Sequence, residues 1–200
     1  MKRIIFYLAA LLVIGILLGF AVPRVYTGPV KPGPIIQAAN NARQIQIALL
    51  QSGKGLPGDL KASGEIGNLP DFVNLLVRSG ALKPGDLKLF SSRGIKAYQG
   101  NLDATGYLAP PFKDENSSFK VYLVRESDPP DTFLMATKNF TYGKPLDPKA
   151  VPLLGGKGFV VIRKSGDVCI YKRQQVFNFQ LIGRLPGGGT VESPENCLNP

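Results

Sequence analysis

The hydrophobic pattern of the chain opens with one long uncharged run. Lys2 and Arg3 are followed by residues 4–22, which contain no charged side chain. At about 1.5 Å per residue, a helix of this length just spans a hydrocarbon core of roughly 30 Å, so the run predicts a transmembrane helix. A cleaved secretory signal is one alternative, because the start is basic and small residues, Gly19 and Ala21, lie near the end of the run. A helix in the core of a soluble domain is the other.

The next segment, residues 23–34, is rich in proline and glycine. Proline lacks a backbone N–H and clashes with the preceding helical turn, so these residues cannot continue one helix. We expect a linker here, which ends or kinks the predicted membrane helix.

From residue 35 the pattern changes to steps of three and four. The apolar positions of this face are Ile35, Ala38, Ala42, Ile45 and Leu49. Such spacing predicts an amphipathic helix that ends at Ser52-Gly53 and packs on a sheet of the same domain. The run spans barely two heptads, which is too short to predict a coiled coil.

The middle of the chain predicts few regular elements. We expect a glycine-rich loop over residues 52–70, then a short helix over 72–78 that Asp71 caps and Gly80 closes. Another turn is expected over residues 86–90. Residues 91–117 read as mostly irregular.

The second half alternates between apolar and polar positions with a period of two, which predicts strands. The expected strands cover residues 119–123, 132–137, 159–163, 168–172 and 177–181. Ser165-Gly166-Asp167 predicts a hairpin turn. Helix first and antiparallel strands afterwards is an α+β order. The expected organisation is therefore an anchor over 1–22, a linker over 23–34 and an extracytoplasmic α+β domain over 35–200.

Composition excludes several classes of enzyme. The chain has no histidine and two cysteines, so it cannot form a Ser-His-Asp triad, a Cys-His dyad or an H-E-x-x-H zinc site. We expect no catalytic residue, no metal and no cofactor. A Ser–Lys dyad has no spacing rule, so an anchored enzyme without histidine stays open as an alternative.

The two cysteines are Cys169, in the predicted hairpin, and Cys197, near the end of the chain. Outside the cytoplasm they are candidates for a disulfide that fixes the C-terminal tail. The alternative is a buried thiol at Cys169 and a free Cys197.

Charge gives a weaker indication of partners. The 24 basic residues exceed the 14 acidic ones, for a formal charge of +10, and no basic run reaches five residues. Nucleic-acid proteins concentrate such charge and interleave aromatic residues, so we expect no nucleic-acid partner. The alternative is a basic envelope module that binds an anionic polymer or DNA.

Three stretches resemble known sequences. Residues 11–23 are similar to the hydrophobic helix of pseudopilins, residues 40–49 to the N-x-x-R-Q-I-x-x-A-L segment that follows it, and residues 158–168 to a late hairpin of the same group. The chain thus resembles bacterial pilin-like proteins of the type II secretion and type IV pilus class.

The resemblance implies a pilin-like fold and a non-enzymatic, structural role in a secretion or envelope apparatus. It implies a single-pass protein of the inner (cytoplasmic) membrane that contacts the bilayer through residues 4–22 and has other pilin-like or secretion subunits as partners. The chain departs from the family at its start. Residues 2–6 supply neither the glycine nor the glutamate of the prepilin processing motif.

Overall fold

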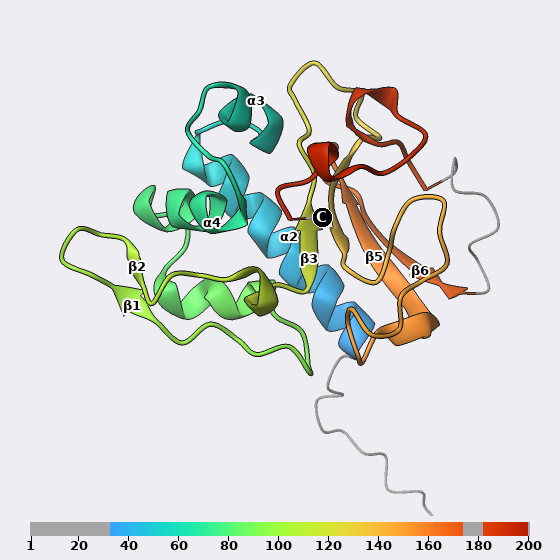
Figure 1. Cartoon of the computed structure of the whole chain (residues 1–200), viewed down its shortest axis with the longest axis horizontal. Coiled ribbons are helices and arrows are strands. Elements are labelled where there is room, and N and C mark those ends of the chain that lie inside the picture. Colours follow the sequence, from blue (N-terminus) through green and yellow to red (C-terminus); the bar gives the residue numbers. More distant parts are fainter. Residues whose placement is uncertain (1–32, 174–181, 200) are drawn as a thin grey trace, which may run out of the picture. The chain divides into compact units, whose positions relative to one another are not determined.

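The computed structural model describes residues 33–173 and 182–199. It has an α+β fold in which a long helix packs on a four-stranded antiparallel sheet (Figure 1). Its helices are α2 (Pro34–Ser52), α3 (Pro57–Ala62) and α4 (Leu69–Arg78), and its strands are β1 (Asn101–Leu102), β2 (Leu108–Ala109), β3 (Phe119–Val121), β4 (Phe133–Thr137), β5 (Gly158–Arg163) and β6 (Val168–Lys172). Short 3-10 turns are η1 (Pro84–Phe90), η2 (Asp114–Asn116), η3 (Gly155–Lys157), η6 (Pro186–Gly188) and η7 (Pro194–Asn196).

Three predicted segments lie wholly or mostly outside the described residues. These are the membrane run, residues 4–22, the linker up to residue 32, and the last expected strand, residues 177–181. In the part of the chain that the structure describes, no helix is both long and apolar enough to cross a membrane.

Helix α2 forms where the three-and-four spacing predicts it. Pro34 occupies its first turn, where the missing N–H has no helical partner to lose. Gly53 ends the helix with φ of 63°, and its N–H donates to the carbonyl of Leu50 at 3.3 Å. Ala38, Ala42 and Ile45 face inward and are almost fully buried, so the predicted inner face is confirmed.

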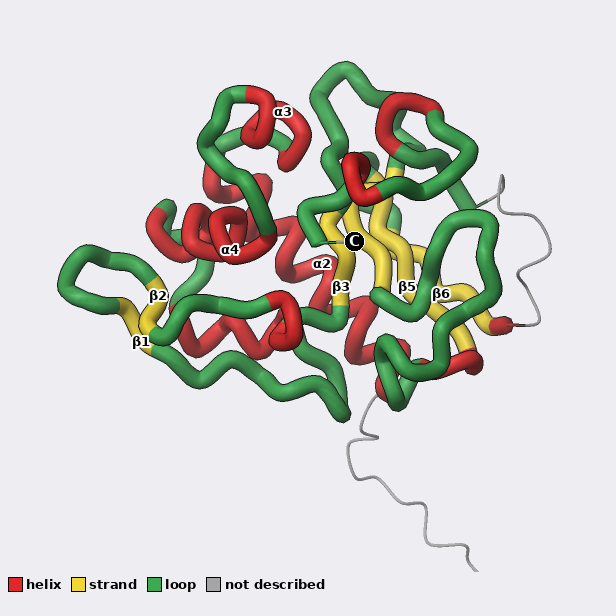
Figure 2. Tube along the Cα trace, in the orientation of Figure 1, coloured by secondary structure: helices red, strands yellow, loops and turns green. Residues whose placement is uncertain are grey.

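The four main strands form one sheet in the order β3-β4-β5-β6, and each neighbouring pair is antiparallel. Figure 2 shows these strands in yellow, surrounded by long green loops. The hairpin predicted at Ser165-Gly166-Asp167 joins β5 to β6. Register is fixed there by pairs from Gly158 with Lys172 to Ile162 with Val168.

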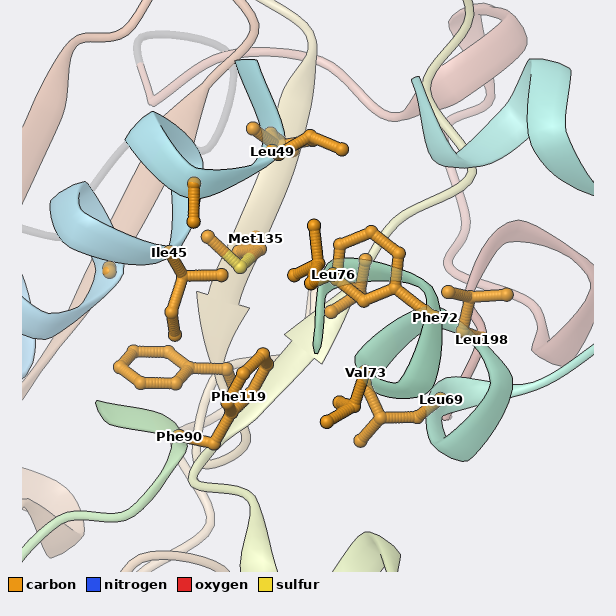
Figure 3. Packing of buried hydrophobic residues seen from close by; sticks show 14 of the residues in the cluster. Ile45, Leu49, Leu69, Phe72, Val73, Leu76, Phe90, Phe119, Met135 and Leu198 are labelled. Atoms are coloured by element: carbon orange, nitrogen blue, oxygen red, sulfur yellow. The ribbon is translucent and has the colours of Figure 1, made fainter. Parts of the chain in front are cut away.

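One core lies between α2, α4, η1 and the sheet. Figure 3 shows Ile45 and Leu49 of α2 pointing toward Leu76 of α4, Phe119 of β3 and Met135 of β4. All five side chains are buried. Removing such area from water contributes about 25 cal/mol per Å², which makes this the main stabilising layer of the domain.

A second core covers the other face of the sheet. Successive residues of β5 alternate between the two cores, with Phe159 and Val161 in the second and Val160 and Ile162 in the first. Phe140 stacks on Phe159 with ring centroids 4.4 Å apart. Residues 138–157 and 182–199 cover this face, so strands β3, β4 and β5 are buried on both faces.

Two predictions for the middle of the chain need correction. The expected loop 52–70 contains α3, which begins at Pro57, and α4 begins at Leu69 rather than residue 72. Asn68 caps α4 by accepting from the N–H of Asp71 at 2.9 Å. Helix α3 was therefore not predicted, and α4 was predicted to begin three residues late. Each helix has a proline in its first turn, where the missing N–H has no helical partner to lose.

Candidate functional site

The outer face of α2 is the candidate interaction site. Its exposed positions fall on one side of the helix and are Ile36, Gln37, Asn40, Arg43, Gln44, Ile47, Leu50 and Gln51. Three of them are large apolar residues, with Ile36 50% exposed, Ile47 44% and Leu50 66%. We call these three residues, Ile36, Ile47 and Leu50, the α2 stripe. They lie on nearly the same side of the helix, because they are eleven and three positions apart.

The inner face holds the stripe in a fixed direction. Two polar side chains on that face are buried and bonded: the amide of Asn41 donates to the carbonyl of Ser91 at 3.1 Å, and the amide of Gln46 donates to the carbonyl of Arg163 at 3.5 Å. Rotation of α2 about its axis would bury Ile47 and break both bonds. The partner of Asn41 is fifty positions away, so spacing along the chain could not predict it.

A second polar arrangement lies beneath the C-terminal tail, residues 191–199. Lys120 of β3 forms an ion pair with Glu192, and their side chains are only 5% and 7% exposed. Glu192 also accepts from the hydroxyl of Tyr122 and from the N–H of Tyr142, both at 3.0 Å. The ammonium of Lys120 reaches the hydroxyl of Thr141 at 3.3 Å.

This cluster joins three segments that are distant in sequence. Its buried charges are paired and hydrogen-bonded, which is the condition under which charges are tolerated inside a protein. Burial, reinforced by the charge of Glu192, raises the pKa of Tyr122 well above its ordinary value, so the phenol stays a hydrogen-bond donor. The cluster therefore acts as a latch for the tail.

The alternation of residues 119–123 placed Lys120 and Tyr122 on the face opposite Phe119. Both are buried, because the tail and the 138–157 loop cover that face. The apolar run of β5 was an available signal, since a strand without polar alternation is typically covered on both sides.

The structure does not bring the two candidate disulfide cysteines together. Both are free thiols. Cys197 pairs with Tyr122 beside β3, whereas Cys169 lies on β6, at the opposite edge of the sheet. Four strand spacings of about 4.8 Å place them about 19 Å apart. A disulfide needs Cα atoms within about 7 Å, so this fold cannot accommodate the bridge.

A cleft of about 590 Å³ opens between α3, the segment after β3 and the tail. Lys61, Arg125 and Asp128 line it. The carboxylate of Asp128 accepts from the N–H groups of Arg125 at 2.7 Å and Gly187 at 3.4 Å, so it holds two loops together. Among residues 33–173 and 182–199, no group of three or more metal-binding side chains gathers.

Comparison of the chain with protein-family models, with curated proteins and with solved structures finds no match.

Proposed function

We propose that this chain is a membrane-anchored, pilin-like protein of a secretion or envelope apparatus, which acts by assembly and not by catalysis. Residues 4–22 hold it in the inner membrane, and the domain from α2 onward lies outside the cytoplasm. The two-sided character of α2 carries the proposal. One face of this helix builds the core, and the other presents the α2 stripe to solvent.

The stripe supports assembly for a physical reason. Burial of apolar surface against a partner would stabilise the complex by roughly 25 cal/mol per Å², which these side chains do not gain while they are exposed to water. Ile47 and Leu50 recur at helical spacing, which suits packing against another helix. The helix-then-sheet order and the resemblance of residues 40–49 to the pilin-like segment favour the same reading.

The missing processing motif shapes the proposal. Residues 2–6 lack the prepilin glycine and glutamate, so the proposal includes no prepilin-type processing and keeps residues 4–22 as the membrane anchor. Fractionation of cells, followed by N-terminal sequencing of the membrane-bound protein, tests this directly. A mature protein that begins after residue 22, or that is recovered outside the membrane fraction, would contradict the anchor.

Assembly through the stripe is tested by photo-crosslinking in cells. A photoreactive amino acid at Ile47 is expected to form adducts with a second copy or with another membrane subunit, identified by mass spectrometry. The matched control carries the same group at Glu65, which is exposed but lies outside α2. Equal adduct formation at both positions, or none at Ile47, would reject the stripe as the assembly face.

A further inference from the structure

The end of the domain at which α2 begins carries an unusual set of side chains. The first turn of α2 lies beside the start of β5, since a Cβ on Gly158 would be 3.3 Å from Cδ1 of Ile35 (Figure 1). Gly158 pairs with Lys172 of β6. The chain therefore enters the domain next to the last residues of the sheet.

Two loops complete this end. A Cβ on Gly156 would lie 3.8 Å from a guanidinium nitrogen of Arg173, and Arg173 and Lys144 line the same cleft of about 490 Å³. A Cβ on Gly94 would lie 3.6 Å from Cγ of Leu153, so the 91–97 loop lies against the 143–157 loop. Asn139 fixes the second loop by donating to the carbonyls of Gly155 and Gly158, both at 2.7 Å.

These segments are strongly basic. We call residues 91–97, 143–157 and 171–173 the basic pole. Its basic side chains are all exposed and are Arg93, Lys96, Lys144, Lys149, Lys157, Lys172 and Arg173. Asp147 is the one carboxylate in these fully described segments. Across the rest of residues 33–173 and 182–199, basic and acidic residues are equal in number, so the pole carries the net positive charge of the described domain.

An apolar tip accompanies the charge. Leu153 is 36% exposed, and Pro152 beside it is exposed as well. Ile36, in the first turn of α2, is half exposed. Basic residues around a small apolar tip match a membrane surface, where the charges meet anionic headgroups and the tip enters the boundary with the acyl chains.

Chain length puts a bilayer within reach of this end. Ten residues lie between Val22, the end of the predicted span, and Gly33, the first described residue, which makes eleven steps along the chain. A fully extended chain of that length covers at most about 40 Å. Attraction to an anionic surface acts within a Debye length of about 10 Å at 0.1 M salt, so a tethered pole can come into its range.

We infer that the basic pole docks the domain on the anionic surface of the bilayer that holds its anchor. The inference rests on the proposed membrane anchoring and adds an orientation, in which the first turn of α2, with Ile36, faces the lipid and Ile47 and Leu50 of the α2 stripe stay accessible from the side. The occupant is a bilayer containing anionic phospholipid. A soluble polyanion such as DNA is the competing occupant.

The test uses the full chain reconstituted into vesicles. One set of vesicles contains phosphatidylcholine alone. The second set contains phosphatidylcholine and anionic phosphatidylglycerol. An environment-sensitive fluorophore is attached at Leu153→Cys in a Cys169→Ser background, since Cys197 is buried. We expect its emission to shift to the blue on phosphatidylglycerol vesicles, and the shift to vanish at high salt.

Matched variants separate a local effect from net charge. The pole variant carries Lys149→Glu, Lys157→Glu and Arg173→Glu, and should lose the shift. The control variant carries Lys61→Glu, Lys83→Glu and Arg125→Glu, which change the net charge equally at exposed sites outside the pole, and should keep it. A fluorophore at Lys54→Cys, beyond the other end of α2, should show no shift.

Flotation of the same vesicles reports the anchor separately. A chain that floats with both vesicle types but shows equal emission in both would overturn the pole while leaving the anchor intact. A chain held only by phosphatidylglycerol vesicles at low salt would reject the anchor and support the pole. Release from both would contradict both proposals. If added DNA shifts the emission of the chain in phosphatidylcholine vesicles, and phosphatidylglycerol vesicles do not, the basic pole binds a soluble polyanion and not the bilayer.

Discussion

At the scale of single residues, the buried pair of Lys120 and Glu192 offers the sharpest test of the latch. Removing one partner leaves the other charge buried without compensation, which typically costs about 3–5 kcal/mol. We expect Lys120→Met to lower the free energy of unfolding by about 3 kcal/mol, since Tyr122 and Tyr142 still donate to Glu192. Urea unfolding of the detergent-solubilised chain, followed by circular dichroism, measures the loss.

The same experiment has two controls. Lys113→Met removes an exposed pair with Glu115, whose side chains are 68% and 71% exposed, and should change stability by less than about 1 kcal/mol. The double change Lys120→Met/Glu192→Gln removes both charges and should recover most of the loss. Equal effects of Lys120→Met and Lys113→Met would show that the latch does not stabilise the fold.

The two thiols should differ in reactivity. Burial, followed by the charge of Glu192, raises the pKa of Cys197 from 9.0 to about 12, so at pH 8 roughly one thiol in ten thousand is a thiolate. A thiol reagent should therefore label only half-buried Cys169 in the native chain, and both cysteines in denaturant. Mass spectrometry locates the label. Failure of either cysteine to react in denaturant without a reductant would indicate the disulfide that the fold excludes.

Alkaline pH should weaken the fold through the same residue. The unfolded thiol loses its proton near pH 9, whereas folded Cys197 keeps it to about pH 12, so the unfolded state binds fewer protons in this window. Stability is then complete below pH 9 and falls above it, by at most about 1.4 kcal/mol per pH unit from one group. Cys197→Ser should reduce the slope of unfolding free energy against pH. Tyr122 acts in the same direction and leaves a residual slope.

At the scale of elements, α3 depends on a glycine. A Cβ on Gly58 would overlap the carbonyl oxygen of Leu123 and lie 2.7 Å from Cγ of Arg125. We expect Gly58→Ala to push α3 from the segment after β3 and to cost about 1–3 kcal/mol, although alanine is the better helix former. Thermal unfolding measures the loss. Gly85→Ala is the matched control, because a Cβ on Gly85 would have no other atom within 4 Å. Stabilisation by Gly58→Ala would contradict the close approach.

Elements whose signal is local were predicted well. Spacing along the chain determines which face of α2 is buried, and the hairpin of β5 and β6 follows from apolar runs around Ser165-Gly166-Asp167. Helix α3 was not predicted and α4 was predicted to begin three residues late, because a proline is compatible with a loop as well as with the first turn of a helix. The latch was not predictable, because Lys120 and Glu192 are 72 positions apart and no local pattern links them.

At the scale of the whole molecule, the C-terminal tail continues the sheet. Leu198 donates to the carbonyl of Val121 at 2.8 Å, and Leu123 donates to the carbonyl of Asn196 at 2.9 Å, so the tail pairs along the outer edge of β3. Asn199 adds side-chain bonds, accepting from the N–H of Val121 at 2.9 Å and donating to the carbonyl of Phe119 at 2.8 Å. The tail thus covers a strand edge as well as the second core.

Removal of the tail should therefore change the association of the domain and not only its stability. A chain that stops at residue 190 loses Glu192 and Asn199 together, which leaves Lys120 buried without its carboxylate and exposes the backbone of β3. Unpaired strand edges recruit other chains, so we expect concentration-dependent oligomers and faster hydrogen exchange in β3. Glu195→Ala, an exposed change within the tail, should leave both measurements unchanged. A truncated chain that keeps the size and exchange pattern of the full protein would show that β3 needs no cover, and that the latch serves another purpose.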